Sequence, residues 1–128
     1  MGSLLIEIVI DCREPATLAR WWGQVLGWPV TDDPRGLSWV SRTGSYDPPV
    51  LVFVPVPEPK TVKNRIHIDV GPVGCEQGEE LQRLLDLGAE PVDVGQQDAP
   101  WVVLSDPEGN EFCLLGRRAD ALVPSSAG

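Results

Sequence analysis

The order of apolar and polar positions along the chain repeats after about 60 residues. The strand-like run Ile6-Glu7-Ile8-Val9-Ile10 is matched by Ile66-His67-Ile68-Asp69-Val70. Each run is followed by a helical pattern that stops at a Leu-Gly pair, and then by a strand that a tryptophan opens, Trp39 in the first half and Trp101 in the second. Such a repeat predicts two similar supersecondary units that pair to enclose one cavity.

The first half predicts a strand, a helix and further strands. Residues 4–10 are nearly all aliphatic, which indicates a buried strand that carries one carboxylate, Glu7. Pro15 suits the first position of a helix, where its missing N–H costs nothing, and Gly27 suits the helix end. Further strands are predicted over 37–42 and 50–56.

The second half repeats this scheme. Its helix buries the stripe Leu81, Leu84 and Leu85, and residues 106–110 form a hairpin turn. Each half therefore predicts the order β-α-β-β-β, and the whole chain an α+β fold. We expect one domain over residues 4–116, with module one at 4–57 and module two at 65–116. The small residues of 119–128 are expected to form a flexible tail.

Composition and charge narrow the function classes. The net charge of −9 repels nucleic acid and anionic membrane surfaces. No apolar run approaches the roughly 20 residues of a membrane span. The cysteines, Cys12, Cys75 and Cys113, show no CxxC spacing, which argues against a disulfide framework and favours a reducing compartment. We therefore expect a cytoplasmic protein that binds neither nucleic acid nor membrane.

Four motifs, in this order, carry a resemblance to a known superfamily: Ile10–Pro15, Leu26–Trp28, Lys63–Asp69 and Asp106–Leu115. Together they resemble the vicinal oxygen chelate superfamily, which includes glyoxalase I, extradiol dioxygenases, fosfomycin resistance enzymes and bleomycin resistance proteins, and within it the small glyoxalase-like domains. The resemblance implies two βαβββ modules that form a cup-shaped mixed sheet, with the ligand on its concave face, in a homodimer. It is specific for the fold and not for a reaction.

The resemblance also implies where a metal would bind. In the metal-using members, the first and last strands of each module supply four ligands. By position these are Glu7, a residue near Phe53 or Val54, His67 and Cys113. The strand around Phe53 has no metal-binding side chain, and Cys113 stands where lyase-type members have a glutamate. Three ligands and a water can hold a catalytic zinc, but because one ligand is missing we expect neither a metal nor another cofactor.

Two readings remain open for the polar residues of module two. His67 either shapes a pocket wall through a hydrogen bond, or contacts the ligand or acts as a general base. Asp69 shares its strand face. Cys113 is either a small buried apolar residue or a nucleophile, and nothing nearby in the sequence activates its thiol. We expect all three to line the pocket, and we assign no catalytic residue.

The tryptophans indicate an aromatic wall. Trp39 and Trp101 are placed at corresponding positions of the two modules, where they either pack in the core or stack on a flat ligand. Neighbouring helical positions point about 100° apart, so Trp21 and Trp22 are not both expected to face the core. A stacking pocket requires neither a metal nor a general base.

The sequence therefore predicts a homodimer that binds a hydrophobic or aromatic, drug-like small molecule without transforming it. The bleomycin resistance branch, which sequesters an antibiotic, is the nearest analogy. The predicted ligand contacts are Glu7, Trp39, Phe53, His67, Asp69, Trp101 and Cys113. One alternative is a metal-dependent lyase, isomerase or dioxygenase that uses Glu7, His67 and Cys113. The other is a domain whose role is interaction or regulation.

Overall fold

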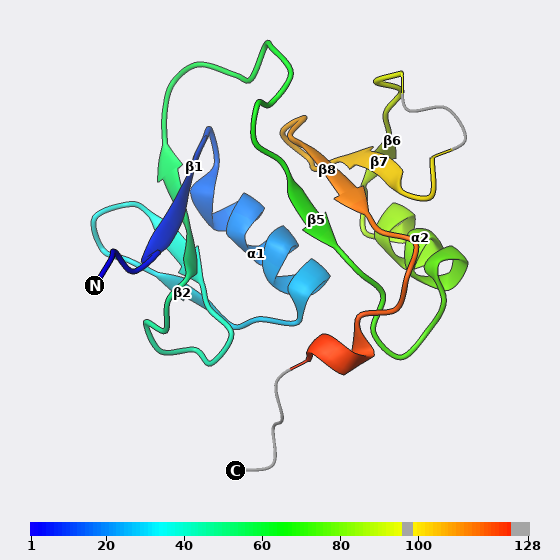
Figure 1. Cartoon of the computed structure of the whole chain (residues 1–128). Coiled ribbons are helices and arrows are strands. Elements are labelled where there is room, and N and C mark those ends of the chain that lie inside the picture. The colour runs from blue at the N-terminus through cyan, green and yellow to red at the C-terminus, as the bar shows by residue number, and fades with distance from the viewer. Residues whose placement is uncertain (96–98, 124–128) are drawn as a thin grey trace. The chain divides into compact units, whose positions relative to one another are not determined.

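The computed structural model of the protein describes residues 1–95 and 99–123. The chain divides into two compact units, Met1–Thr61 and Val62–Gly128, and each unit has its own sheet (Figure 1). Each has the predicted order β-α-β-β-β, which confirms the α+β class and the two βαβββ modules. Within the described ranges, no helix is both long and apolar enough to cross a bilayer.

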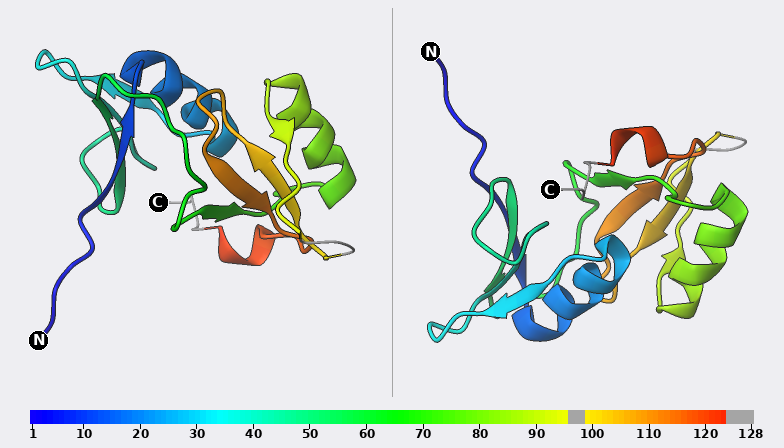
Figure 2. Two further views of the ribbon diagram at one scale, coloured as in Figure 1. Left: turned by 90° about the horizontal axis from the view of Figure 1, so that it is seen from above. Right: turned by 90° about the horizontal axis from the view of Figure 1, so that it is seen from below.

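The first unit is a mixed four-stranded sheet with one helix. Its elements are β1 (Glu7–Cys12), α1 (Pro15–Leu26), β2 (Val30–Asp32), β3 (Ser38–Val40) and β4 (Val50–Pro55). The strand order is β1-β4-β3-β2, with β1 parallel to β4 and the other pairs antiparallel. Helix α1 packs on β2, β3 and β4, and the views of Figure 2 show it along one face of this sheet.

The ends of α1 follow the sequence signals, whereas its tryptophans do not. Pro15 occupies the first turn, and Gly27 ends the helix in the left-handed conformation with φ 68°. Trp21 and Trp22 are both buried, at 7% and 1% exposure, with ring centroids 5.3 Å apart in an edge-to-face pair. The expectation that the two tryptophans do not both face the core is wrong, since both rings are buried and pack against each other edge-to-face.

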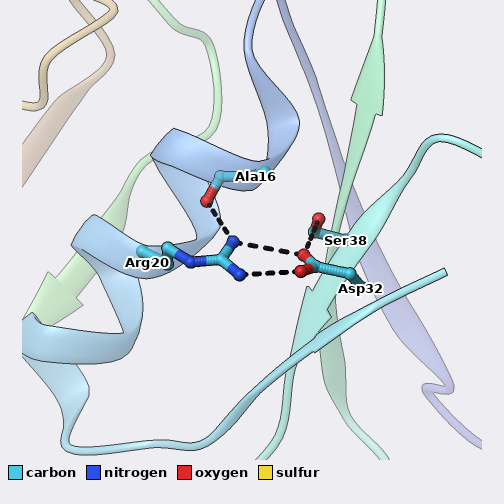
Figure 3. Close-up of polar contacts among 4 residues, drawn as sticks. All are labelled: Ala16, Arg20, Asp32 and Ser38. Carbon is cyan, nitrogen blue, oxygen red and sulfur yellow. Dashed lines mark hydrogen bonds and ion pairs between the residues drawn. The ribbon is translucent and has the colours of Figure 1, made fainter.

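An ion pair ties α1 to the strands (Figure 3). The Arg20 guanidinium donates to both carboxylate oxygens of Asp32, at 3.2 and 2.7 Å, and to the carbonyl oxygen of Ala16 at 3.0 Å. The hydroxyl of Ser38 donates to Asp32 Oδ1 at 2.8 Å. The hydrogen bonds from Arg20, and then from Ser38, lower the pKa of Asp32 to about 2.

The first strand is less buried than the sequence predicts. It begins at Glu7 instead of residue 4, and Leu4, Ile6 and Val9 are 72%, 49% and 52% exposed. A continuous aliphatic run is typical of a strand covered on both faces. Strand β1 is instead an edge strand of its sheet, paired within this unit to β4 alone. The expectation of a buried strand over 4–10 is therefore wrong.

The second unit repeats the first. Its elements are β5 (Ile68–Val70), α2 (Gln77–Asp86), β6 (Glu90–Pro91), β7 (Val102–Ser105), β8 (Glu111–Leu114) and the 3-10 helix η1 (Asp120–Leu122). The strand order is β5-β8-β7-β6, with β5 parallel to β8. Figure 2 shows α2 alongside this sheet. Leu84 of the predicted stripe is fully buried, and its neighbours Leu81 and Leu85 are half-buried.

The hairpin turn over 106–110 is confirmed. The buried Asp106 accepts hydrogen bonds from the backbone N–H groups of Glu108 and Asn110, both at 2.9 Å, and Gly109 has φ 88°. Part of the segment predicted as a flexible tail is held in place. The Ala119 N–H donates to the carbonyl of Pro72 at 2.8 Å, while residues 124–128 lie outside the described ranges.

Candidate ligand-binding site

An open hollow lies on one face of the second sheet, with a cavity volume of about 310 Å³. We call it the second-unit hollow. Strand register builds it, because Asp69 of β5 is opposite Cys113 of β8, which is opposite Val103 of β7. Side chains two residues apart on a strand share a face, so His67 joins Asp69 and Glu111 joins Cys113. The volume lies in the range of small-molecule sites.

The polar part of the second-unit hollow is a compact group. His67 Nδ1 lies 2.9 Å from Asp69 Oδ1 and 3.9 Å from Cys113 Sγ. Asp69 is therefore the partner that orients the imidazole, and with Nδ1 as the donor the lone pair of the neutral ring is on Nε2. Burial raises the pKa of the Cys113 thiol, and the negative charge of Asp69 raises it further. A protonated thiol is a poor nucleophile, so the arrangement favours hydrogen bonding over covalent catalysis.

The same group meets the donor requirements of zinc. One ligand atom each from His67, Asp69 and Cys113 can be chosen so that all lie within 4.8 Å of one another. On a tetrahedral zinc such atoms are about 3.3–3.8 Å apart, so small movements would close the site. Imidazole, carboxylate and thiolate together fit zinc better than manganese or magnesium. In the first unit, the positions of β4 on the hollow-lining face are Val52 and Val54, which bind no metal.

The apolar part of the second-unit hollow is an aromatic wall with aliphatic neighbours. Trp101 precedes β7 and is 42% exposed, and Val94, Val103 and Leu115 line the hollow beside it. Glu111 also lines it and accepts a hydrogen bond from the backbone N–H of Asn64 at 2.8 Å. A flat apolar molecule would thus contact an indole ring on one side and the imidazole–carboxylate pair on another.

The first unit has an open hollow of its own on the corresponding strands, with a cavity volume of about 440 Å³. We call it the first-unit hollow. Glu7 of β1, Trp39 of β3 and Val52 of β4 line it together with Tyr46. The Tyr46 hydroxyl donates to Glu7 Oε2 at 2.9 Å, and its ring is edge-to-face with Trp39 at a centroid distance of 5.5 Å. That hydrogen bond to Glu7 raises the pKa of Tyr46.

The structure distributes the predicted contacts over the two hollows. His67, Asp69, Trp101 and Cys113 line the second-unit hollow, and Glu7 and Trp39 line the first-unit hollow. Phe53 is fully buried and is not among the described residues that line either hollow. The reason is strand alternation. Because Val52 and Val54 face the first-unit hollow, Phe53 between them points to the opposite face of β4.

Register also shifts the correspondence between the two tryptophans. Trp39 is opposite Val52, whereas the residue opposite Cys113 is Val103. When the two units are matched on their hollow-lining strands, Trp39 therefore corresponds to Val103, and Trp101 lies two residues earlier. Both tryptophans still line hollows, because a shift of two residues preserves the face.

Sequence reasoning missed other lining residues for different reasons. Glu111 lies two residues before Cys113, and Val103 lies two residues after Trp101, so both could have been placed in the lining from strand alternation. Tyr46 lies in the loop before β4 and meets Glu7, which is 39 residues away, so no periodic pattern indicates it.

Comparison with known proteins agrees with this architecture. A family model described as glyoxalase-like domain matches residues 7–115. No curated protein sequence matches the chain significantly. The fosfomycin resistance protein FosX of Listeria monocytogenes, solved with Mn(II) and 1S,2S-dihydroxypropylphosphonic acid, has a TM-score of 0.64 at 13% identity, over 93% of this chain and 94% of that chain.

Two further solved structures share the fold. The trypanothione-dependent glyoxalase I of Leishmania major has a TM-score of 0.60 at 13% identity, over 90% of this chain and 87% of its own. TioX from Micromonospora sp. ML1 has a TM-score of 0.54 at 18% identity, over 88% and 97%. At such identities the likeness establishes the fold and leaves the ligand to be argued from this chain's own residues.

Proposed function

Because the chain belongs to the glyoxalase-like domain family, we propose that it is a small-molecule binding protein that holds a hydrophobic or aromatic ligand without transforming it. The observation that carries the proposal is the second-unit hollow, where Trp101 and aliphatic side chains lie beside the His67–Asp69 pair. An apolar pocket with a few fixed polar groups is the usual composition of a small-molecule site.

The energetics favour binding over catalysis. Stacking on one indole contributes about 0.5–1.5 kcal/mol beyond area burial, and each buried methylene of the ligand contributes about 0.8 kcal/mol. The Cys113 thiol keeps its proton because burial and Asp69 raise its pKa. His67 is already hydrogen-bonded to Asp69, so its Nε2 is suited to accept a hydrogen bond from a ligand hydroxyl or amide.

The biological role that we propose is sequestration of an antibiotic. A role in drug resistance is supported by the fosfomycin resistance protein FosX of Listeria monocytogenes, which shares the fold. We further propose that the protein acts as a homodimer in the cytoplasm. Each sheet has edge strands that a partner can cover, and no disulfide joins the cysteines of the described residues, as a reducing compartment favours.

A second candidate function is a zinc-dependent lyase, isomerase or dioxygenase. The grouping of His67, Asp69 and Cys113 favours it, since these side chains can supply three ligands and leave a fourth position for water or substrate. When bound, zinc would supply Lewis-acid chemistry. Elemental analysis of the purified chain separates the two functions. One equivalent of zinc that resists dialysis and is lost in His67→Ala would favour the enzyme.

The direct test of the binding proposal is a titration with N-phenyl-1-naphthylamine, an uncharged aromatic dye. We expect a saturable rise in dye fluorescence at micromolar concentration, with one dye bound per chain. Trp101→Ala should weaken binding. Absence of saturable binding, or binding that is equal in the variant, would contradict the proposal.

A further inference from the structure

The first-unit hollow combines two aromatic rings with a carboxylate, and we propose that it binds an organic cation of the substituted-ammonium class. This cation site uses residues of the first unit alone, is separate from the function proposed for the second unit, and requires no ligand at Trp101.

The aromatic rings form two walls. Trp39 lies in the middle of β3, between Thr31 of β2 and Val52 of β4 in the register. Tyr46 packs against it with ring planes 74° apart. In such an edge-to-face pair, which we call the aromatic corner, the edge of one ring covers part of the other ring's face, while the faces of the first ring are not covered by its partner. Such faces attract cations that are weakly hydrated, above all quaternary and other alkylated ammonium groups.

The charge at this corner is negative. The Glu7 carboxylate is held beside the rings by the Tyr46 hydroxyl at 2.9 Å. A phenol donor positions the carboxylate without neutralising it. Arg35, which also lines the hollow, is engaged by Asp33 through Nε–Oδ1 at 2.9 Å and Nη2–Oδ2 at 2.8 Å. The described residues that line the hollow therefore include two carboxylates and one guanidinium, and the negative charge that remains after the Arg35–Asp33 pair is that of Glu7.

The loop that carries Tyr46 is ordered by its own hydrogen bonds. The buried hydroxyl of Ser41 donates to the carbonyl oxygen of Ser45 at 2.6 Å and accepts from the N–H of Gly44 at 3.0 Å. The ion pair of Arg42 with Asp47, at 2.8 Å, spans the same loop. The aromatic corner is therefore present before a ligand arrives, which lowers the entropic cost of binding.

The remaining lining selects an alkylated cation over a metal ion. Val9, Val52 and Val54 give the hollow an aliphatic surface suited to methyl and methylene groups. Divalent metals instead require several oxygen ligands. The carboxylates among the described residues that line the hollow are Glu7 and Asp33, and Asp33 is already held by Arg35. The chemistry thus fits a positive charge spread over a carbon-covered head group.

The test compares choline with 3,3-dimethylbutan-1-ol, its uncharged isostere, on the whole ¹⁵N-labelled chain. The indole N–H of Trp39 is identified by its loss in Trp39→Phe. We expect choline to shift this signal saturably at millimolar concentration and the isostere to bind about fivefold more weakly or worse, since about 1 kcal/mol of the attraction is electrostatic. Glu7→Gln, which keeps the shape and removes the charge, should weaken choline binding by a similar factor.

Matched controls separate this inference from the binding proposed for the second unit. Trp101→Phe should leave choline binding unchanged, and Glu7→Gln should leave the N-phenyl-1-naphthylamine titration unchanged. Equal binding of choline and its isostere to the wild-type chain would overturn the inference without the need for any variant. So would a Trp39 signal that does not respond to choline, or undiminished choline binding in a folded Glu7→Gln chain.

Discussion

Replacement of Trp101 by alanine separates a ligand-binding tryptophan from a core tryptophan. Trp101 is 42% exposed, whereas Trp22 on helix α1 is 1% exposed. Truncation of a fully buried tryptophan costs about 3–5 kcal/mol of unfolding free energy. A half-exposed ring in an open hollow loses far fewer contacts, so Trp101→Ala should cost about 1 kcal/mol.

Trp101→Ala should change the free energy of dye binding more than it changes the free energy of unfolding. Loss of the stacked indole removes about 1 kcal/mol beyond area burial, together with part of the dye's contact area. A total of about 1.4 kcal/mol corresponds to a tenfold increase in the dissociation constant of N-phenyl-1-naphthylamine. Urea unfolding and the dye titration are measured on the same preparations, with Trp22→Phe as a milder change in a core tryptophan that serves as the control. That control should lower the unfolding free energy and leave the affinity of the folded protein unchanged.

The opposite pattern would refute this reasoning. If Trp101→Ala lowers stability as much as a core truncation and leaves dye affinity unchanged, Trp101 is a packing residue. The second-unit hollow would then not be a stacking site.

Four further results are expected. The hydrogen bond from Arg20 lowers the pKa of Asp32 from 3.8 to about 2, so the stability that Asp32 contributes is present above its ordinary pKa and is lost as the pH falls towards 2. In urea unfolding, the difference in stability between wild type and Asp32→Asn should therefore narrow between about pH 5 and pH 2, and a constant difference would contradict this. Phe53→Ala should cost about 3–5 kcal/mol of unfolding free energy without changing dye affinity in the folded fraction, since Phe53 is a core residue. Asp69→Asn should speed the alkylation of Cys113 by iodoacetamide, because loss of the negative charge lowers the thiol pKa. The rate is measured by peptide mass spectrometry, and an unchanged rate would show that burial alone sets that pKa. Sedimentation should give a dimer at micromolar concentration, and a monomer there would contradict the proposed assembly.

Local patterns determine most of what could be predicted. The repeat of two aliphatic runs, two helices ending near glycine, and Trp-led strands was enough for the βαβββ order of both units. Two-residue alternation was enough to place Asp69 on the same strand face as His67, and the resemblance to a known superfamily brought Cys113 to the same site.

The features that the sequence did not predict depend on contacts between residues distant in sequence, or on where a strand lies in its sheet. The sequence did not show which residues of β4 face the hollow, so Phe53 was assigned to the site. A shift of one residue along a strand moves a side chain to the opposite face of the sheet. Tyr46 reaches Glu7 from a loop, where no periodicity exists. The exposure of β1 side chains such as Val9 was not predicted because composition does not encode that helix α1 makes its main contacts with β2, β3 and β4.

Whether the second-unit hollow binds a small molecule without a metal is tested most directly by a native mass spectrum of the whole chain with N-phenyl-1-naphthylamine, recorded before and after treatment with EDTA. We predict one dye per chain in both spectra, and a reduced dye-bound fraction in Trp101→Ala. A spectrum without any dye-bound species, or dye binding that disappears with zinc on EDTA treatment, would contradict the account.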